Sequence, residues 1–231
     1  EVVFHLAAPV NPDGPSNEAL AQSAIVDGSA AMVEACTEFG ARLVYVGSCA
    51  EYGALPTPYR EDQRCVPSGV YGTLKHEASK RVTAASDIDW SVVRPFRAIG
   101  PGDTRSVVAL AARAAVQGVS FDMTDGLQVR EWNHVDAVAK GVVAAGAHPE
   151  AVRQIINIGG GPRLSVRGIV DRIFALAGTD GTLVRAGVRP RRPHEVDTLF
   201  GDHSKANGLW GTIAQPNLDA TLVDILQSVS S

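Results

Sequence analysis

Short runs of hydrophobic residues alternate along this chain with longer segments whose hydrophobic positions recur every three or four residues. The short runs at 2–7, 43–46 and 90–93 are rich in valine and aromatic residues and have the length of strands. The longer segments at 17–39 and 68–85 have the spacing of helices that bury one side. This alternation predicts βαβ units and a parallel sheet.

The three predicted strands are hydrophobic on both faces, so we expect helices on both sides of the sheet. Right-handed crossovers should place these strands side by side and parallel. The first strand starts at the second residue, and a strand buried on both faces needs a neighbour on each edge. We therefore expect further elements to precede Glu1 in the complete protein. The alternative is that residues 2–7 form an edge strand of a small complete domain.

The second half of the chain, after Gly100-Pro101-Gly102, has shorter and more mixed elements. We expect helices at 105–117, 135–147, 165–177, 203–209 and 217–229, and strands near 127–131 and at 154–158. This pattern indicates a smaller lobe that is interleaved with the sheet domain. The sequence contains no internal repeat and no linker long enough to separate two independent domains.

Composition excludes several classes of protein. A content of 45% hydrophobic and 20% charged residues is typical of a globular chain with a buried core. The net charge of −4 argues against binding to nucleic acid or to a membrane surface. No hydrophobic run approaches the roughly 18 residues of a membrane-spanning helix, and no signal peptide is visible. The 3 cysteines and 6 histidines have neither disulfide-scaffold nor metal-ligand spacing, so we expect no metal and a reducing cytoplasm.

The first chemical candidate is the pair Tyr71 and Lys75, four residues apart in a predicted helix. Residues at this spacing lie on one face of a helix. An ammonium group beside a phenol favours the phenolate and lowers the pKa of the phenol from about 10. A tyrosine activated in this way can act as a general acid or base. The alternative is a partly exposed helix with an extended surface lysine.

A second candidate is Ser48, which follows the strand at 43–46 in a turn of small residues. The carboxyl ends of parallel strands are where open α/β sheets bind their ligands. A hydroxyl group there can form a hydrogen bond with a reacting oxygen, although a serine after a strand often only stabilises a turn. His5 ends the preceding strand, and we expect it to be buried.

These residues belong to a series of short motifs that follow one another in a characteristic order. The motifs are His5-Leu6-Ala7-Ala8, Gly47-Ser48-Cys49-Ala50-Glu51-Tyr52-Gly53, Tyr71-Gly72-Thr73-Leu74-Lys75, Arg94-Pro95-Phe96-Arg97-Ala98-Ile99-Gly100-Pro101-Gly102, Arg130-Glu131-Trp132-Asn133-His134-Val135-Asp136, Asn157-Ile158-Gly159-Gly160-Gly161, Arg192-Pro193-His194-Glu195 and Gly201-Asp202-His203-Ser204-Lys205. Together they resemble the extended short-chain dehydrogenase/reductases, the NAD-dependent epimerase/dehydratase family that acts on nucleotide sugars. The resemblance covers nearly the whole chain.

The resemblance implies an α/β fold with a Rossmann-like, doubly wound parallel sheet that lacks its first strands, and a smaller C-terminal substrate lobe. Residues 1–100 would form a partial dinucleotide-binding domain to which later segments return, and residues 101–231 would form mainly the substrate-binding lobe. It also implies a homodimer formed by the two long helices. The helix faces that would meet, unless they face the sheet instead, carry Leu20, Ala24, Gly28 and Ala31 on the first helix and Ala78, Val82 and Ala85 on the second.

The resemblance also implies roles for single residues, with NAD or NADP as cofactor and a nucleotide sugar as substrate. Tyr71 would be the acid/base, Lys75 its activator and a ligand of the nicotinamide ribose, and Ser48 the second hydrogen-bond partner of the reacting C–O group. The residues placed at the cofactor, besides Tyr71 and Lys75, are Ala7, Ala8, Pro95 and Phe96. Those placed at the substrate, besides Ser48, are Cys49, Arg97, Arg130, Arg192 and Glu195. Arginine suits a diphosphate because its planar guanidinium binds two oxygens at once, but Arg130 and Arg192 could instead form surface ion pairs.

Some positions depart from the family pattern. The G-x-x-G-x-x-G fingerprint that binds the dinucleotide is absent from the 231 residues, and so is the residue that selects NAD or NADP. Cys49 and Ala50 stand where sugar-nucleotide dehydratases carry Asp-Glu, which disfavours elimination of water. Glu51 before Tyr52 resembles the loop of 4-keto-hexose reductases. We therefore expect NAD(P)-dependent oxidoreduction of a nucleotide sugar, of the 4-epimerase or 4-keto-reductase type. The alternative is a non-catalytic relative that uses the fold for binding or assembly.

Overall fold

The computed structural model describes residues 1–9, 15–193 and 195–230. The chain divides into two compact units, each built from several segments. The first unit contains residues 1–96, 139–158 and 201–213, and the second contains 97–138, 159–200 and 214–231. The chain therefore passes several times from one unit to the other.

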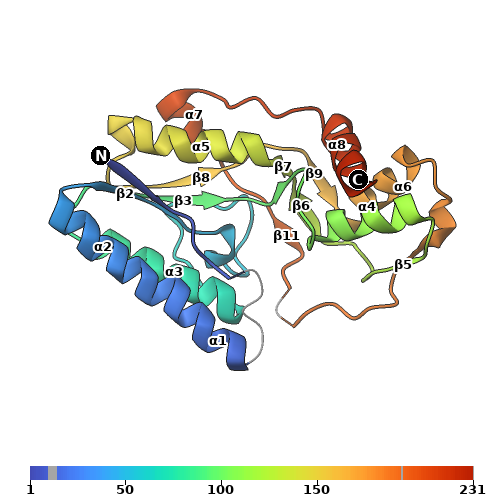
Figure 1. Cartoon of the computed structure of the whole chain (residues 1–231), viewed down its shortest axis with the longest axis horizontal. Helices are drawn as coiled ribbons and strands as arrows, with labels where there is room; N and C mark the ends of the chain where they lie inside the picture. Colours follow the sequence, from blue (N-terminus) through green and yellow to red (C-terminus); the bar gives the residue numbers. More distant parts are fainter. Residues whose placement is uncertain (10–14, 194, 231) are drawn as a thin grey trace. The chain divides into compact units, whose positions relative to one another are not determined.

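The first unit is built on a parallel sheet of four strands in the order β1-β2-β3-β8 (Figure 1). The strands are β1 (Val2–His5), β2 (Arg42–Val46), β3 (Trp90–Pro95) and β8 (Gln154–Ile158). β2 pairs with β1 and β3, and β3 also pairs with β8, all in parallel. The prediction that the first three strands are adjacent and parallel is confirmed. The strand predicted at 154–158 completes this sheet.

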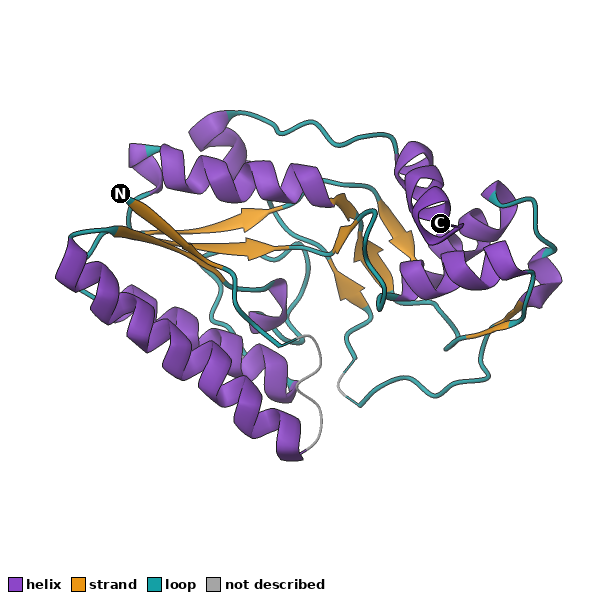
Figure 2. Ribbon diagram, viewed as in Figure 1, coloured by secondary structure: helices purple, strands orange, loops and turns teal. Residues whose placement is uncertain are grey.

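Helices cover both faces of this sheet (Figure 2). One face carries α1 (Pro15–Ala21), a π-helical segment η1 (Gln22–Asp27), α2 (Gly28–Phe39) and α3 (Gly69–Ala84). Figure 1 shows α5 (Val135–Ala147) and α7 (Ser204–Trp210) on the other face. The helix predicted at 17–39 is therefore one continuous rod with a π-helical middle. It ends where Gly40 adopts the left-handed conformation, with φ of 62°, that glycine tolerates best.

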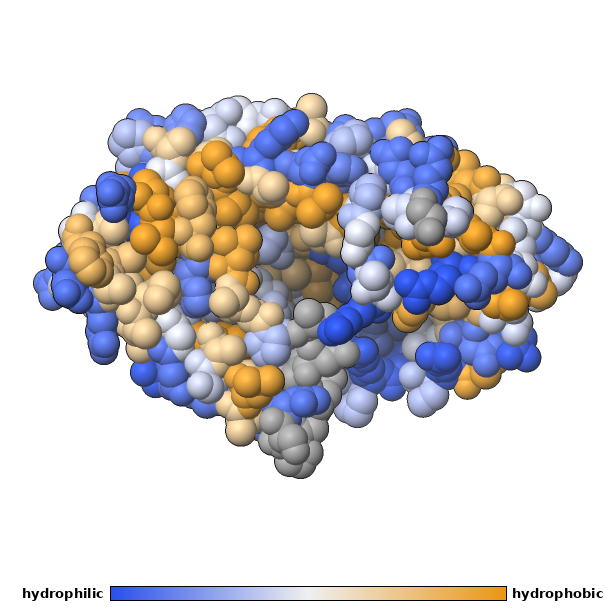
Figure 3. All heavy atoms as spheres, viewed as in Figure 1, coloured by the Kyte–Doolittle hydropathy of each residue, from blue (hydrophilic) through white to orange (hydrophobic). Residues whose placement is uncertain are grey.

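The edge strand β1 is less buried than its sequence suggests. Val2 and Phe4 are 41% and 39% exposed, and Leu6 and Val143 are also exposed. Figure 3 shows hydrophobic surface over the region where Figure 1 draws β1 and α5. Alternating residues of a strand face opposite sides of a sheet, so His5 is buried while Phe4 remains partly exposed. Within the described residues, β1 is therefore an edge strand whose hydrophobic side chains are partly exposed, as expected for a strand without a neighbour on one edge.

The helix faces proposed for a homodimer do not both point outward. Leu20 is 62% exposed, but Ala78 and Val82 are completely buried. The two buried residues belong to the hydrophobic core that α3 forms with α1–α2 and the sheet. Hydrophobic spacing identified the buried face of α3 but not the neighbour that buries it. A homodimer remains a prediction, and its contact could not use Ala78 or Val82.

The second unit combines three helices with short strands. Its helices are α4 (Val107–Gln117), α6 (Val166–Leu176) and α8 (Leu218–Ser230), and its strands are β4 (Ala98–Ile99), β5 (Phe121–Asp122), β6 (Val129–Glu131), β7 (Asn133–His134), β9 (Arg163–Ser165), β10 (Val184–Arg185) and β11 (Thr198–Leu199). The helices enclose a core that includes Ile169, Phe174 and Leu222. Single turns of 3₁₀ helix occur in both units. The first unit contains η2 (Cys49–Glu51) and η3 (Pro149–Ala151), and the second contains η4 (Gly181–Leu183).

Candidate active site

The serine predicted to be functional lies just after the carboxyl end of β2. Ser48 is the N-cap of η2, with an extended backbone at φ −162° and ψ 148°. Its Oγ accepts a hydrogen bond from the Ala50 amide at 3.1 Å, and Glu51 Oε1 accepts one from the Ser48 amide at 2.9 Å. This reciprocal arrangement is a capping box, which its S-x-x-E sequence favours. Both the amide and the hydroxyl of Ser48 are therefore held in place by hydrogen bonds within this turn.

Tyr71 lies near the start of α3 and interacts with Ser48. Burial raises the pKa of Tyr71 to about 12, and a hydrogen bond with Ser48 opposes that effect. The expectation that Lys75 would lower this pKa was wrong for the structure described. Burial penalises the phenolate more than the surrounding groups stabilise it. Tyr71 is therefore a neutral phenol at neutral pH.

Lys75 is a buried cation on the same helix, with only 2% of its surface exposed. Its Nζ donates a hydrogen bond to the Val46 carbonyl at 2.8 Å and lies 5.0 Å from the centre of the Tyr45 ring. Burial lowers the pKa of Lys75 to about 8, while the negative charge of Glu51 raises it. The alternative of an extended surface lysine is therefore excluded.

Gly72 allows α3 to approach η2 closely. A Cβ atom at this position would lie 2.6 Å from the Ala50 carbonyl oxygen, well inside contact distance. The absence of a side chain brings the first turns of α3 against the loop that carries Ser48. Gly72 therefore helps to position the neighbouring Tyr71 close to the Ser48 loop.

Sequence reasoning missed a buried ion pair beneath this loop. Glu51 is completely buried, and its Oε2 accepts a hydrogen bond from Arg94 Nε at 3.0 Å and forms an ion pair with Arg94 Nη2 at 2.9 Å. The Arg94 guanidinium lies 4.6 Å from the centre of the Tyr52 ring. The Tyr52 hydroxyl in turn donates to Asn157 Oδ1 at 2.8 Å. The capping-box spacing could have indicated Glu51, but its partner is 43 residues away.

The residues predicted at the cofactor differ in accessibility. Ala7 is exposed and Ala8 is half-buried. Phe96 is 1% exposed and packs against Tyr59 and His203, so a cofactor could not reach its ring without rearrangement. The prediction that these residues contact a cofactor stays open.

The residues predicted at the substrate fall in both units. Ser48 and the half-buried Cys49 belong to the first unit, whereas Arg97, Arg130, Arg192 and Glu195 belong to the second. The structure brings Arg130 and Glu195 together in an ion pair of 3.1 Å, and Arg130 is 6% exposed. Arg130 therefore forms a buried rather than a surface ion pair. His194 of the same motif lies outside the described residues.

The side chain of Arg97 is exposed, and its guanidinium lies 5.8 Å from the centre of the Trp132 ring. The side chain of Arg192 is also exposed, while its carbonyl accepts a hydrogen bond from the Glu195 amide at 3.2 Å. Of the three arginines predicted at the substrate, Arg97 and Arg192 are therefore exposed, whereas Arg130 is buried in its ion pair with Glu195.

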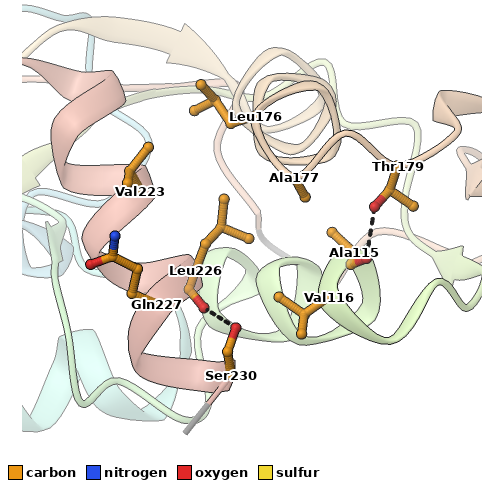
Figure 4. Close-up of a pocket in the computed structure, with 9 residues that line it drawn as sticks. All are labelled: Ala115, Val116, Leu176, Ala177, Thr179, Val223, Leu226, Gln227 and Ser230. Atoms are coloured by element: carbon orange, nitrogen blue, oxygen red, sulfur yellow. Dashed lines mark hydrogen bonds between the residues drawn. The ribbon is translucent and has the colours of Figure 1, made fainter.

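A separate groove of about 370 Å³ lies between α4, α6 and α8 (Figure 4). Its polar lining is largely internally bonded: the Thr179 hydroxyl donates to Ala115 and the Ser230 hydroxyl to Leu226, both at 2.8 Å. None of the predicted site residues lines it. Across the described residues, no cluster of three or more potential metal ligands occurs, and no helix is long and apolar enough to cross a membrane.

Comparison with known proteins identifies the family. The model of the NAD dependent epimerase/dehydratase family matches residues 1–159. The chain belongs to this family. Solved structures of similar fold include a UDP-glucuronic acid 4-epimerase from Bacillus cereus in complex with UDP-glucuronic acid and NAD. That structure has a TM-score of 0.92 at 20% identity and covers 99% of this chain and 75% of the other. The expected α/β Rossmann-like fold is confirmed.

Curated relatives include several activities of this family. A dTDP-4-dehydrorhamnose reductase of Mycobacterium tuberculosis is 32% identical over 131 residues, and a dTDP-glucose 4,6-dehydratase of Streptomyces griseus is 29% identical over 177 residues. These matches cover 54% and 74% of this chain. The chain spans about half the length of these relatives, 43% of the reductase and 53% of the dehydratase. MoeE5 in complex with UDP-glucose and NAD has a TM-score of 0.89 at 26% identity, with coverage of 99% of this chain and 79% of the other.

Proposed function

We propose that the intact protein is an NAD(P)-dependent enzyme that oxidises or reduces a nucleotide sugar at C4, as a 4-keto reductase or a 4-epimerase. The observation that carries this proposal is the interaction between Tyr71 and Ser48 beside the buried Lys75. A phenol and a hydroxyl that meet at the carboxyl end of a parallel strand can hold one substrate oxygen between them.

Tyr71 would move the proton at that oxygen. Its raised pKa keeps it as the neutral phenol near pH 7, so the resting form is a proton donor. A proton donor is what reduction of a keto group requires, because the carbonyl oxygen gains a proton as the carbon gains hydride. Ser48 would stabilise the same oxygen by donating a hydrogen bond. The described state therefore favours the reductive direction.

The residues present fit the nicotinamide half of the cofactor. The protonated Lys75 amine has three N–H donors, and one of them forms the hydrogen bond to the Val46 carbonyl, so donors remain for ribose hydroxyls. NAD(P), when bound, supplies or accepts the hydride. The pyrophosphate half has no counterpart in the sequence of these 231 residues, because they contain no G-x-x-G-x-x-G turn.

Elimination of water, the reaction of the dehydratase relatives, is disfavoured by the serine loop. Cys49 and Ala50 bring no carboxylate to the site. The carboxylate of Glu51 is fully buried and paired with Arg94, so it cannot serve as an accessible acid or base. The loop therefore supports hydride exchange at the sugar carbon and proton exchange at its oxygen, which need no second acid.

The exposed guanidinium groups of Arg97 and Arg192 are the proposed partners of the nucleotide diphosphate. Arg130 and Glu195 would act as a pair, with Glu195 accepting hydrogen bonds from ribose hydroxyls. An arginine bound to phosphate forms two parallel charge-assisted hydrogen bonds, which orients the substrate as well as binding it.

The proposal is tested by offering the intact protein two substrates with NAD(H) and NADP(H). A dTDP-4-keto-6-deoxyhexose tests reduction, followed as loss of reduced nicotinamide absorbance together with formation of the alcohol. UDP-glucose tests epimerisation, followed by NMR as formation of UDP-galactose without net consumption of cofactor. Either result supports the proposal and selects the reaction. Turnover of neither substrate, nor of the UDP-glucuronic acid that a similar protein binds, would overturn it.

A further inference from the structure

We propose that Glu51 is the positioning residue of this centre: one buried carboxylate holds the Ser48 backbone in place and keeps the Lys75 amine protonated. The inference deepens the proposed function, because it concerns the same Ser48, Tyr71 and Lys75. It assigns to Glu51 a role that acts through these residues and not by contact with substrate.

The two carboxylate oxygens of Glu51 have different partners. Oε1 accepts the hydrogen bond from the Ser48 amide at 2.9 Å, and Oε2 accepts a hydrogen bond from Arg94 Nε at 3.0 Å and lies 2.9 Å from Arg94 Nη2. The His76 ring lies 3.8 Å from Oε2. A carboxylate that is bonded on both oxygens cannot rotate without breaking a contact. The orientation of Ser48 is therefore coupled to the presence of Arg94.

The space around this carboxylate is tight. A Cβ atom at Gly47 would lie 2.3 Å from Glu51 Oε1, so the carboxylate packs directly against the Gly47 backbone. Lys75 donates its hydrogen bond to Val46, the residue before Gly47. Glu51 and Lys75 therefore both contact the last residues of β2, and their opposite charges share one buried environment.

Positively and negatively charged groups from several elements surround Lys75 and Glu51. Lys75 interacts with His5 on β1, Tyr45 on β2 and Glu51 on η2, and Tyr71 lies one turn earlier on its own helix. Glu51 in turn interacts with Arg94, His76 and Cys65, and the Arg94 guanidinium also lies over the Tyr52 ring. Among the described groups that act on Lys75, Glu51 raises its pKa against the effect of burial. Without that negative charge, burial alone would favour a neutral amine.

A protonated Lys75 matters for the proposed chemistry. The protonated amine carries more N–H donors than the neutral amine, and these are the groups that would bind the ribose hydroxyls of the cofactor. Glu51 thus acts on the proposed cofactor contact through the charge of Lys75, and on the hydroxyl that would bind the sugar oxygen through the backbone of Ser48.

The experiment follows the charge of Lys75 directly. The intact protein is labelled with ¹³C,¹⁵N-lysine, the Lys75 side-chain signal is assigned from its loss in Lys75→Met, and its pH titration is compared among variants. The other three lysines of this chain are exposed, and the loss of one signal in Lys75→Met distinguishes Lys75 from them. In Glu51→Gln we expect the acid dissociation constant of Lys75 to rise about tenfold, equivalent to one pH unit. Glu51→Asp keeps the charge and should restore most of the parent titration.

The matched control is Glu77→Gln, which removes an exposed carboxylate from the same helix, where it pairs with Arg81 at 3.0 Å. This variant should leave the Lys75 titration unchanged. Glu51→Gln leaves Arg94 unpaired, and if it does not fold, the double variant Glu51→Gln/Arg94→Gln removes both charges and should show the same direction of change. A folded variant without Glu51 whose Lys75 titrates as in the parent would overturn the inference. Because this readout needs no turnover, an inactive parent would count against the proposed function only.

Discussion

At the residue scale, the centre is governed by burial as much as by its charges. Burial raises the pKa of Tyr71 to about 12 and lowers that of Lys75 to about 8. Both shifts favour the uncharged form of the side chain. The two residues therefore start from a state in which the phenol is fully protonated and the amine is closer to losing its proton than an exposed lysine.

Replacement of Tyr71 by Phe tests the role of the phenol. The intact Tyr71→Phe protein should lose turnover by roughly 10²-fold or more, the scale of losing a general acid or base, while remaining folded. The measurement is kcat under saturating substrate and cofactor. The control is Thr73→Ala, which removes a hydroxyl from the exposed side of the same helix. Near-normal turnover of Tyr71→Phe would exclude Tyr71 from the mechanism.

The pKa of Lys75 predicts a pH-dependent stability. The unfolded lysine titrates near 10.5 and the folded one near 8, so between these pH values the unfolded chain binds more protons. Stability of the parent relative to Lys75→Met should therefore rise from pH 8 to pH 10.5, by at most on the order of 3 kcal/mol. Denaturant unfolding of both proteins across this range measures the difference. A constant or falling difference would contradict the burial of a charged amine.

The sequence located Ser48, Tyr71 and Lys75 because local spacing carries that information. The i, i+4 relation and the strand-end position need no knowledge of distant segments. The direction in which the pKa of Tyr71 shifts could not be predicted in the same way, because burial depends on how the whole unit packs. The partnership of Glu51 with Arg94 joins η2 to β3 and is also invisible to local patterns.

At the element scale, one approach between two elements positions the centre. α3 packs against η2 where Gly72 faces the Ala50 carbonyl. Periodicity predicted α3 and its buried face well, since Leu74, Ala78 and Val82 recur at helical spacing. It could not tell whether that face meets a sheet, another helix or a second subunit, and the structure selects burial within the first unit for Ala78 and Val82.

Replacement of Gly72 by Ala tests this approach. The added Cβ would lie 2.6 Å from a backbone oxygen, and a backbone cannot move aside as a flexible side chain can. We expect Gly72→Ala to lower the free energy of unfolding by about 1–3 kcal/mol and to reduce turnover, because α3 must move away from Ser48. Denaturant unfolding and kcat measure the two effects.

The matched control is Gly208→Ala in α7, where no heavy atom lies within 4 Å of the added Cβ. Alanine is the better helix former, so this variant should be neutral or stabilising by up to about 1 kcal/mol. Equal stability effects at Gly72 and Gly208 would show that the short contact at Ala50 has no energetic consequence.

At the scale of the whole molecule, each of the two units is built from segments that are separated in the sequence. Residues 139–158 and 201–213 belong to the first unit although each follows a long stretch of the second. The segment 139–158 contains β8, which pairs with β3. The sequence predicted a strand at 154–158 but not its partner, since strand pairing across some 60 residues depends on the complete fold. The same non-local pairing places Asn157 beside Tyr52 and Tyr59.

The last prediction concerns the cofactor and the chain as a whole. The pyrophosphate of a dinucleotide binds best where a glycine-rich turn opens onto a helix N-terminus, because free N–H groups and the helix dipole meet its charge. The 231 residues contain the nicotinamide-side candidates Ser48, Tyr71 and Lys75 but no G-x-x-G-x-x-G turn. Loss of those phosphate contacts should weaken binding by several kcal/mol, or about 10³-fold. Calorimetric titration of this 231-residue chain with NAD and with NADP should therefore show feeble binding beside the intact protein under the same conditions. Micromolar binding of either cofactor by the chain alone would contradict the argument and locate the phosphate site within these residues.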